Sequence, residues 1–260
     1  MKTRWHLTVS LSILMLNGVG ADEPEKPILN VGGIEQSGGT ITGVVKFEGK
    51  KVKRKTIKTL SADPICKKHH KGSRLYEERW IFGENDTLQN VFVYVSKGLE
   101  GKTFDAPKKN AVINQLGCVY LPHVSGVIVN QSIEILNNDK TTHNVNCKPK
   151  SNRGFNNVMV EGSKIQQRFS KPEMAVPLKC DVHPWMASYV HVMAHPYFAI
   201  TQDKGTFTIK GLPAGDYKLS VWHEFKKFKP VEGTIDVSVG EGETKQVKFV
   251  YRPPARKNKK

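Results

Sequence analysis

Residues 205–221 read GTFTIKGLPAGDYKLSV, and this stretch sets the pattern for most of the chain. Apolar and polar residues alternate on both sides of Pro213-Ala-Gly215, as they do in two strands joined by a turn. Alternating or continuous apolar runs of strand length recur at residues 40–47, 91–95, 126–136, 175–178, 189–193, 234–239 and 246–250. No amphipathic helix of useful length stands out. The sequence therefore predicts an all-β fold of the sandwich type.

The composition is that of a folded protein with a strong positive charge. The chain has 260 residues, of which 38% are hydrophobic and 25% charged, so one large domain or two small ones can bury a core. Lys and Arg number 40 against 24 Asp and Glu, which gives a net charge of +16. No helix-turn-helix, zinc-finger or RNA-binding motif accompanies this charge, so nucleic acid is not an expected partner. The basic clusters at residues 50–58, 226–229 and 252–260 are expected to be solvated or to face an acidic partner.

The N-terminus has the three parts of an export signal. A basic start at Met1-Lys2-Thr3-Arg4 precedes a short apolar run, and small residues lead up to Ala21. We expect a signal peptide over residues 1–21, a linker over residues 22–38, and a periplasmic or secreted protein. The alternative is a buried N-terminal strand. No later segment is apolar enough for a membrane helix, so no transmembrane segment is expected.

Metal-binding residue types gather at Cys180-Asp-Val-His183-Pro-Trp-Met186. One loop can bring this thiolate, imidazole and thioether to a single centre, and His143 lies in a turn-to-strand context upstream. Two imidazoles, a thiolate and a weak axial thioether are the ligands of a type 1 copper site, whereas zinc has little use for Met. We therefore expect one copper ion held by His143, Cys180, His183 and Met186. The alternative is a structural loop with a buried Cys and a core Met.

The stretch from about residue 122 to 193 resembles the cupredoxins, the amicyanin and plastocyanin type of blue copper domain. The likeness lies in His143-Asn144-Val145 after an Asn-Asp turn and in the Cys-x-x-His-Pro-aromatic-Met pattern. It implies a Greek-key β-sandwich with the four ligands named above. It also implies that Asn144 braces the ligand loop, with Asp181 standing where Thr or Ser is commoner. Pro184 and Trp185 would then form an apolar docking end, with His183 the copper ligand closest to solvent.

A second resemblance frames the first. Residues 206–250 look like the carboxypeptidase regulatory-like, transthyretin-type β-sandwich, and residues 39–47 resemble its opening strand. We expect a β segment over 39–110, a cupredoxin domain over 111–201, a regulatory-like sandwich over 202–251 and a disordered basic tail over 252–260. Either the cupredoxin is inserted into the smaller sandwich, or residues 38–110 form a subdomain of their own. Residues 50–88 match neither family.

The four cysteines of an exported chain raise the question of disulfides. Cys180 is assigned to the metal, and the cupredoxin resemblance makes Cys147 a buried free thiol. Cys66 and Cys118 are then the candidate disulfide, which would join the 50–88 region to the copper domain. The alternative use of Cys66 is a second metal site with His69 and His70.

The expected activity is the transfer of one electron between a donor and an acceptor, one of them an acidic redox partner. The alternative is a copper-storage or structural and adhesion protein without redox turnover. No G-x-S-x-G or H-E-x-x-H motif is present, so we do not expect an enzyme. His191, Met193 and His195 share one face of a strand by alternation. They are expected to form either a partner or metal-loading patch, or a polar outward face with a packed Met.

Overall fold

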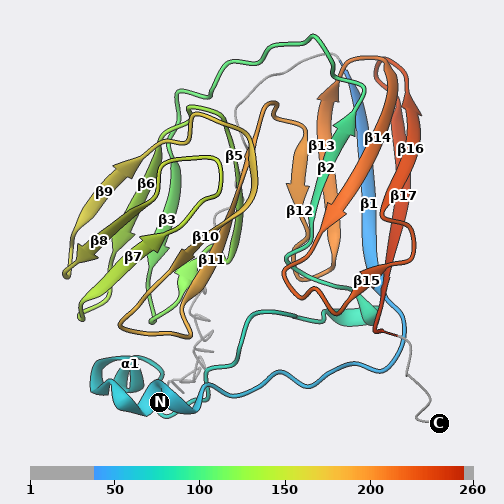
Figure 1. The fold of residues 1–260 in the computed structure, drawn as a ribbon. Helices are drawn as coiled ribbons and strands as arrows, with labels where there is room; N and C mark the ends of the chain where they lie inside the picture. Colours follow the sequence, from blue (N-terminus) through green and yellow to red (C-terminus); the bar gives the residue numbers. More distant parts are fainter. Residues whose placement is uncertain (1–37, 255–260) are drawn as a thin grey trace, which may run out of the picture. The chain divides into compact units, whose positions relative to one another are not determined.

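The computed structural model describes residues 38–254. Over these residues the protein has an all-β fold (Figure 1). The fold class predicted from the alternating sequence is confirmed. The expected signal peptide, nearly all of the linker and the end of the basic tail lie outside the described residues. Within residues 38–254, no helix is both long and apolar enough to cross a bilayer.

Eight strands from the two ends of the described chain form a first β-sandwich. One sheet has the order β13-β1-β17-β15 and the other the order β12-β2-β14-β16. The first sheet contains β1 Gly39–Phe47, β13 Thr206–Leu212, β15 Lys229–Pro230 and β17 Thr244–Arg252. The second contains β2 Phe92–Lys97, β12 Phe198–Ile200, β14 Gly215–Trp222 and β16 Thr234–Val239.

Strand β1 shows how the alternating sequence produces this sandwich. Its residues alternate between buried and half-buried along the whole strand, so that Ile41, Val45 and Phe47 point into the core. Gly43 has no side chain because a Cβ there would lie 2.5 Å from the ring of Phe207. The alternation of apolar and polar residues in the sequence of β1 therefore corresponds to one buried face and one face toward solvent.

A second β-sandwich is built from the middle of the chain. One sheet has the order β5-β11-β10-β7-β8 and the other the order β4-β3-β6-β9. The first sheet contains β5 Val124–Ile128, β7 His143–Cys147, β8 Phe155–Met159, β10 Glu173–Lys179 and β11 Ala187–Met193. The second contains β3 Ala111–Gln115, β4 Tyr120–Leu121, β6 Ile133–Asn137 and β9 Lys164–Gln167.

The pairing of the strands is nested. Strand β1 pairs with β13 and β17, and β2 pairs with β12 and β14, so the second sandwich lies in the sequence between β2 and β12. Two expected boundaries differ from the structure. Phe198–Ile200 pairs with β2 and so belongs to the first sandwich, although residues up to 201 were assigned to the second. Arg252 is the last residue of β17 and not part of a tail.

The connecting segment, residues 48–91, links β1 to β2 of the first sandwich in the sequence and packs against the second sandwich on the way. It contains the 3-10 turns η1 Lys58–Ala62 and η2 Glu84–Asp86 and the short helix α1 Pro64–His69. Asp63 caps α1, because its Oδ1 accepts hydrogen bonds from the N–H groups of Ile65 and Cys66. Leu60 and Cys66 pack in the core of the second sandwich, and Cys66 forms a disulfide with Cys118.

His191 lies inside the protein, which contradicts both arrangements expected for it. Its ring stacks on Phe92 of β2 at 3.9 Å between centroids and meets Trp222 of β14 edge-on at 4.5 Å. His191 is fully buried and Met193 nearly so. His195 lies beyond the end of β11, and the face of β11 that carries His191 and Met193 is covered by the first sandwich and not by water.

Candidate metal centre

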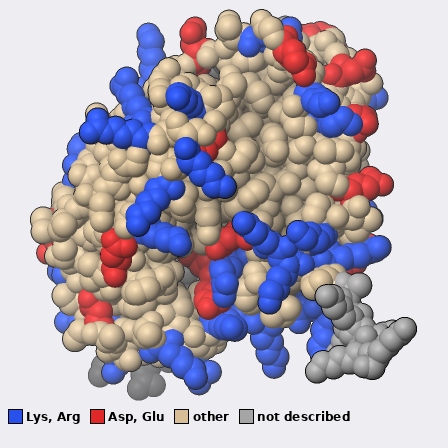
Figure 2. All heavy atoms as spheres, viewed as in Figure 1, with Lys and Arg blue, Asp and Glu red and all other residues tan. Residues whose placement is uncertain are grey.

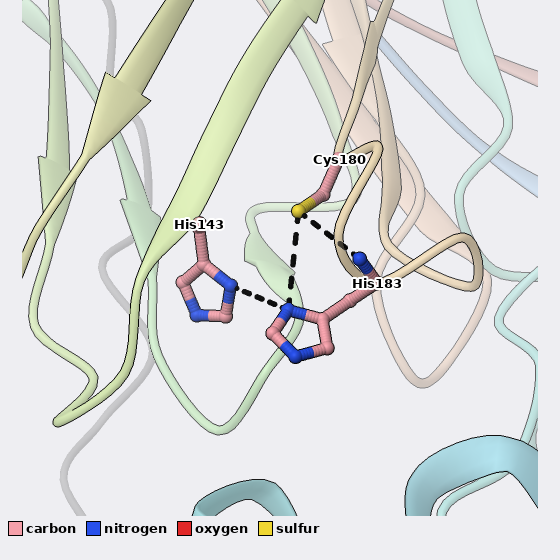
Figure 3. Close-up of side chains that lie close together, drawn as sticks. All are labelled: His143, Cys180 and His183. Atoms are coloured by element: carbon pink, nitrogen blue, oxygen red, sulfur yellow. Dashed lines mark hydrogen bonds between the residues drawn. The ribbon is translucent and has the colours of Figure 1, made fainter. Parts of the chain in front are cut away.

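Three donor side chains converge at one end of the second sandwich (Figure 3). Nδ1 of His143 lies 2.8 Å from Nδ1 of His183, and Sγ of Cys180 lies 3.9 Å from that same His183 nitrogen. The ligand atoms of the three residues all lie within 4.8 Å of one another. All three side chains are buried. The structure thus brings together three of the four residues expected to bind copper around a common point.

The sheet and one tight loop position these donors. Strand β10 pairs with β7 through Leu178 opposite Cys147 and Lys179 opposite Asn146, so the chain after β10 passes beside the start of β7. The loop after Cys180 is closed by two backbone hydrogen bonds, from Met186 N to His183 O and from Cys180 N to Met186 O. The N–H of His183 also donates to Sγ of Cys180 over 3.3 Å. The donors are therefore held by main-chain geometry.

Asn144 and Asp181 connect the loop to the sheet, which is the bracing that the resemblance implied for Asn144. The N–H of Asp181 donates to Oδ1 of Asn144 at 2.6 Å, and Nδ2 of Asn144 donates to Oδ2 of Asp181 at 2.8 Å. The amides of Asn146 and Asn156 donate to the same carboxylate. These hydrogen bonds lower the pKa of Asp181, so its charge is kept at neutral pH.

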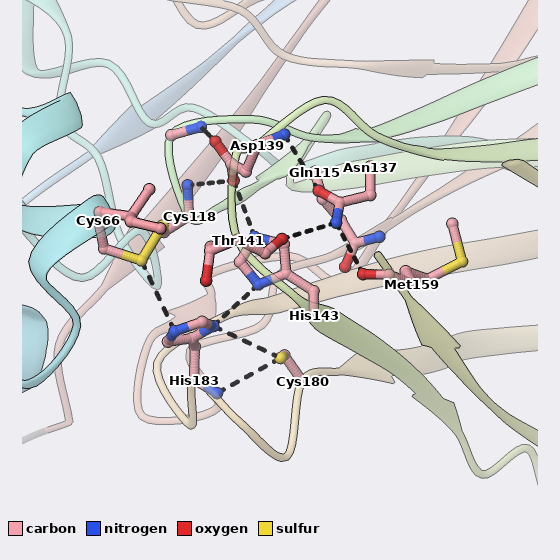
Figure 4. A network of polar contacts seen from close by, with 12 residues as sticks. Cys66, Gln115, Cys118, Asn137, Asp139, Thr141, His143, Met159, Cys180 and His183 are labelled. Carbon is pink, nitrogen blue, oxygen red and sulfur yellow. Dashed lines mark hydrogen bonds and ion pairs between the residues drawn. A yellow bond between two sulfur atoms is a disulfide. The ribbon is translucent and has the colours of Figure 1, made fainter. Parts of the chain in front are cut away.

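Each imidazole is held from behind by a carboxylate, and Figure 4 shows Asp139 beside His143. Nε2 of His143 lies 2.9 Å from Oδ2 of Asp139, and Nε2 of His183 lies 3.0 Å from Oδ2 of Asp63. Metal-binding histidines commonly donate their second ring N–H to a carboxylate, which fixes the tautomer and raises the basicity of the ligating nitrogen. In both rings this leaves Nδ1 as the nitrogen free to ligate.

The charges and hydrogen bonds around Cys180 favour the ionised form of its thiol. Burial raises the pKa of Cys180, but the interaction with His143 and hydrogen bonds from backbone N–H groups outweigh it and lower the pKa. Burial lowers the pKa of His143, but the hydrogen bond to Asp139 and the interaction with Cys180 raise it to about 9. By contrast, burial raises the pKa of the free thiol of Cys147 to about 12. The two free cysteines of the described residues therefore differ sharply in thiolate character.

The donor set fits a soft or borderline metal ion. With Nε2–H directed at a carboxylate in each ring, two Nδ1 lone pairs face each other at 2.8 Å beside a sulfur atom. Such a cluster needs a cation at its centre, which is either a proton or a metal ion. Thiolate and imidazole are the ligands that copper and zinc prefer. The residues present thus match the group that the ligand motif predicts.

The remaining residues expected at the site lie around the same loop. Met186 is 1% exposed and packs in the core of the second sandwich. Pro184 is exposed, and Trp185 is half-buried, with its indole N–H donating to the carbonyl of Cys118. The ring of Trp185 lies 5.0 Å from that of His183. Pro184 and Trp185 also line a pocket of about 700 Å³.

His183, expected to be the copper ligand closest to solvent, is itself buried. It is 2% exposed, as is Cys180, because the connecting segment covers its imidazole edge. Oδ2 of Asp63 lies at 3.0 Å from Nε2, and Sγ of Cys66 lies at 3.6 Å. Because Cys66 is bonded to Cys118, it is also not available for a second metal site with His69 and His70.

Neither carboxylate was predicted from the sequence. Asp139 stands four residues before His143 in the turn, and this spacing was a usable signal. Asp63 is 120 residues from His183 and belongs to a segment with no family resemblance. Its only local signal is Asp63-Pro64, which is typical of a helix start.

Comparisons with known proteins find structural neighbours for part of the chain. No family model and no curated protein matches the sequence. The copper-containing nitrite reductase of Thermus scotoductus SA-01 is 19% identical with a TM-score of 0.32, and the match covers 38% of this chain and 25% of that chain. A purple cupredoxin of Nitrosopumilus maritimus is 20% identical with a TM-score of 0.29, and the match covers 32% and 99%. A mutant of amicyanin with Cu(I) is 15% identical with a TM-score of 0.31, and the match covers 39% and 98%.

The matched part of this chain thus spans about a quarter of the nitrite reductase and nearly all of the two smaller proteins. At these scores the likeness carries no weight for what this chain binds.

Proposed function

We propose that this protein holds one copper ion through His143, Cys180, His183 and Met186 and carries one electron at a time. The observation that supports it is the meeting of two Nδ1 atoms and one thiol, each ring being held from behind by a carboxylate. Met186 is the expected weak axial ligand, since it follows His183 in the same closed loop.

The surrounding chain suits repeated electron transfer. A copper ion bound here would supply the one-electron Cu(I)/Cu(II) couple. The two backbone hydrogen bonds of the loop and the bracing by Asn144 keep the donors in place whichever charge the site carries. His143, Cys180 and His183 are at most 2% exposed, so water is excluded from the donors. A closed site of this kind suits electron transfer and not substrate turnover, which needs an open position.

Trp185 offers a route to a partner. Its ring is next to that of His183 and also lines the pocket described above. The pocket is net basic, because five basic side chains line it against three acidic ones, namely Lys58, Arg79, Lys179, Lys226 and Lys227 against Glu77, Glu78 and Glu224. Figure 2 shows a face on which groups of Lys and Arg side chains dominate over Asp and Glu. These charges would attract an acidic redox partner to the Trp185 pocket.

The first sandwich and the N-terminal sequence complete the proposal. The resemblance of residues 206–250 to the regulatory-like module makes the first sandwich a scaffold for the copper domain. The sequence of residues 1–21 would direct the protein to the periplasm or outside the cell.

One observation favours the alternative of copper storage without turnover. The outer edge of His183, the ligand expected to be closest to solvent, is covered by Asp63 and Cys66. A site with both imidazoles covered would release its metal slowly, and electrons would travel farther to reach a partner. The two functions differ in whether copper in the site exchanges electrons rapidly and reversibly.

Redox titration of the copper-loaded protein tests the proposal. A carrier gives one reversible one-electron wave and exchanges electrons quickly with hexacyanoferrate, an anionic probe. The rate should fall as salt rises, because screening limits the reach of the lysine charges to about 10 Å at 0.1 M.

Trp185→Glu should slow exchange without changing the visible spectrum. The matched control is Val231→Glu, an exposed valine of the first sandwich that is 50% exposed. Irreversible reduction, or a rate insensitive to salt and to Trp185, would favour storage.

A further inference from the structure

The two carboxylates behind the imidazoles share a structural link. Oδ2 of Asp139 accepts the N–H of Cys118 at 2.7 Å, and Oδ1 of Asp63 accepts the N–H of Cys66 at 2.9 Å. Cys66 and Cys118 are bonded to each other. One disulfide therefore joins the two backbone positions that orient the two carboxylates. Figure 4 shows Cys66 and Cys118 with Asp139.

Further contacts direct both carboxylates at the rings. Oδ1 of Asp139 accepts the N–H of Gly117 at 2.6 Å, which leaves Oδ2 for His143. Oδ2 of Asp63 accepts the hydroxyl of Thr141 at 3.1 Å beside His183. Asp139 is 3% exposed, and both of its carboxylate oxygens take part in these contacts.

The disulfide also closes the approach to His183. Cys66 is fully buried and Cys118 is 1% exposed, and Cys66 stands 3.6 Å from Nε2 of His183. Within the described residues, α1 is held on the second sandwich by this bond together with the contact from His70 Nε2 to the carbonyl of Gly117. Loss of the bond would free the segment that supplies Asp63.

We propose that the Cys66–Cys118 disulfide is a lock on the metal centre, which positions Asp63 and Asp139 and holds the connecting segment over His183. Neither cysteine binds the metal. The role of the lock is to slow release of the metal, so it depends on the proposed metal function. Asp63 and Asp139 are positioning residues that act through the imidazoles.

The physical basis is the orientation of the histidine ligands. A carboxylate on Nε2 fixes the tautomer that leaves Nδ1 free, and removing such a partner typically costs about 10- to 100-fold in metal affinity. Asp63 is the N-cap of a six-residue helix, which is too short to be stable without contacts to the rest of the fold. Such a segment needs a covalent tie to keep its carboxylate in place.

The first experiment removes the bond. Cys66→Ala/Cys118→Ala is compared with Cys147→Ala, a buried free cysteine of the same core. Copper-loaded proteins are challenged with excess EDTA, and copper release is followed by the visible spectrum. We expect at least about tenfold faster release from the double variant and no change in the control.

The same variants are compared without metal. Acylation of His183 by diethyl pyrocarbonate, measured by peptide mass spectrometry, should be slow in the wild-type protein and several-fold faster in the double variant. Exposed His69 is the internal reference and should react alike in all proteins. Unchanged acylation and unchanged release in a folded double variant would overturn the lock. A wild-type protein that takes up no copper would refute the proposed function, while the acylation result still decides the lock.

A third variant separates positioning from stability. Asp63→Ser keeps an N-cap for α1 and keeps the disulfide, but its single hydroxyl cannot cap the helix and reach His183 as well. It should shift the copper reduction potential and speed acylation of His183. Asp86→Ser removes an exposed carboxylate of the same segment and should do neither. If Asp63→Ser leaves both readouts unchanged, Asp63 does not position His183, and the lock is wrong even if the double variant fails to fold.

Discussion

Two buried cysteines 33 residues apart in one core have opposite chemistry, and their neighbours explain why. Cys147 ends strand β7 among apolar side chains, where burial keeps the thiol protonated. Cys180 stands at the start of a loop where His143 and two backbone N–H groups face its sulfur. Burial alone therefore does not predict which cysteine can bind a metal. The spacing of Cys180 to His183 and Met186 made it the candidate in the sequence, and the structure places its sulfur beside both imidazoles.

At His143, metal and proton compete for one nitrogen. Its pKa of about 9 means that the ring carries a proton at neutral pH, and the proton must leave when a metal binds. The apparent affinity should therefore rise about tenfold per pH unit between pH 6 and pH 9 and level off above it. Competition titrations across this range measure the slope.

Asp139→Asn provides the control for this titration. It removes the carboxylate that raises the pKa of His143, so the levelling-off should move to lower pH. An affinity that does not change between pH 6 and pH 9 would show that His143 is not a ligand.

At the scale of elements, the loop from Cys180 to Met186 depends on one exposed carboxylate. Asp181 accepts hydrogen bonds from three asparagines on β7 and β8, and these tie the loop to the sheet. Asp181→Ala should leave the strands intact but loosen the loop. We expect faster amide hydrogen exchange over residues 181–186 and a slower, less reversible copper reduction.

The control for Asp181→Ala is Asp236→Ala, which removes an exposed carboxylate paired with Lys218 in the first sandwich. This variant should change neither measurement. Unaltered exchange in Asp181→Ala would mean that the two backbone hydrogen bonds alone hold the loop.

The strands and the ligand loop were predictable from sequence because their information is local. Alternation along β1, β13 and β14 marks a buried face, and the ligand spacing lies within one loop. The connecting segment was not predictable, since it has little regular structure and Asp63 reaches the site across the fold. The burial of His183 was not predictable for the same reason, because the residues that cover it come from that segment.

At the scale of the whole molecule, a buried histidine lies between the sheets of the two sandwiches. Both ring nitrogens of His191 lack a hydrogen-bond partner within residues 38–254, and burial lowers its pKa to about 3. In the unfolded chain the ring takes up a proton below its ordinary pKa of 6.5. The folded state does not, so His191 reduces the free energy of unfolding as the pH falls below that value.

His191→Phe should therefore stabilise the protein, and more so in acid. The substitution keeps the stack on Phe92 and removes two unpaired polar atoms. Relative to wild type, the gain in unfolding free energy should be about 2 kcal/mol larger at pH 5 than at pH 8. Urea unfolding at both pH values gives this difference. An equal gain at both would mean that His191 does not titrate on unfolding.

The nested order of the two sandwiches was one of two arrangements that the sequence left open. Local alternation describes each strand but does not say which strands pair. The parallel pairing of β1 with β17 and the pairing of β2 with β14 join residues about 200 and 120 apart, and only the packed core settles such partners.

The proposed function depends on Cys180 binding copper through its thiolate, together with His143 and His183. The most direct test is the visible absorption of the purified protein loaded with Cu(II), compared with Cys180→Ser and Cys147→Ser. We predict an intense thiolate-to-copper band that disappears in Cys180→Ser and persists in Cys147→Ser. A band that survives in Cys180→Ser, or is lost in Cys147→Ser, would show that Cys180 is not the copper thiolate.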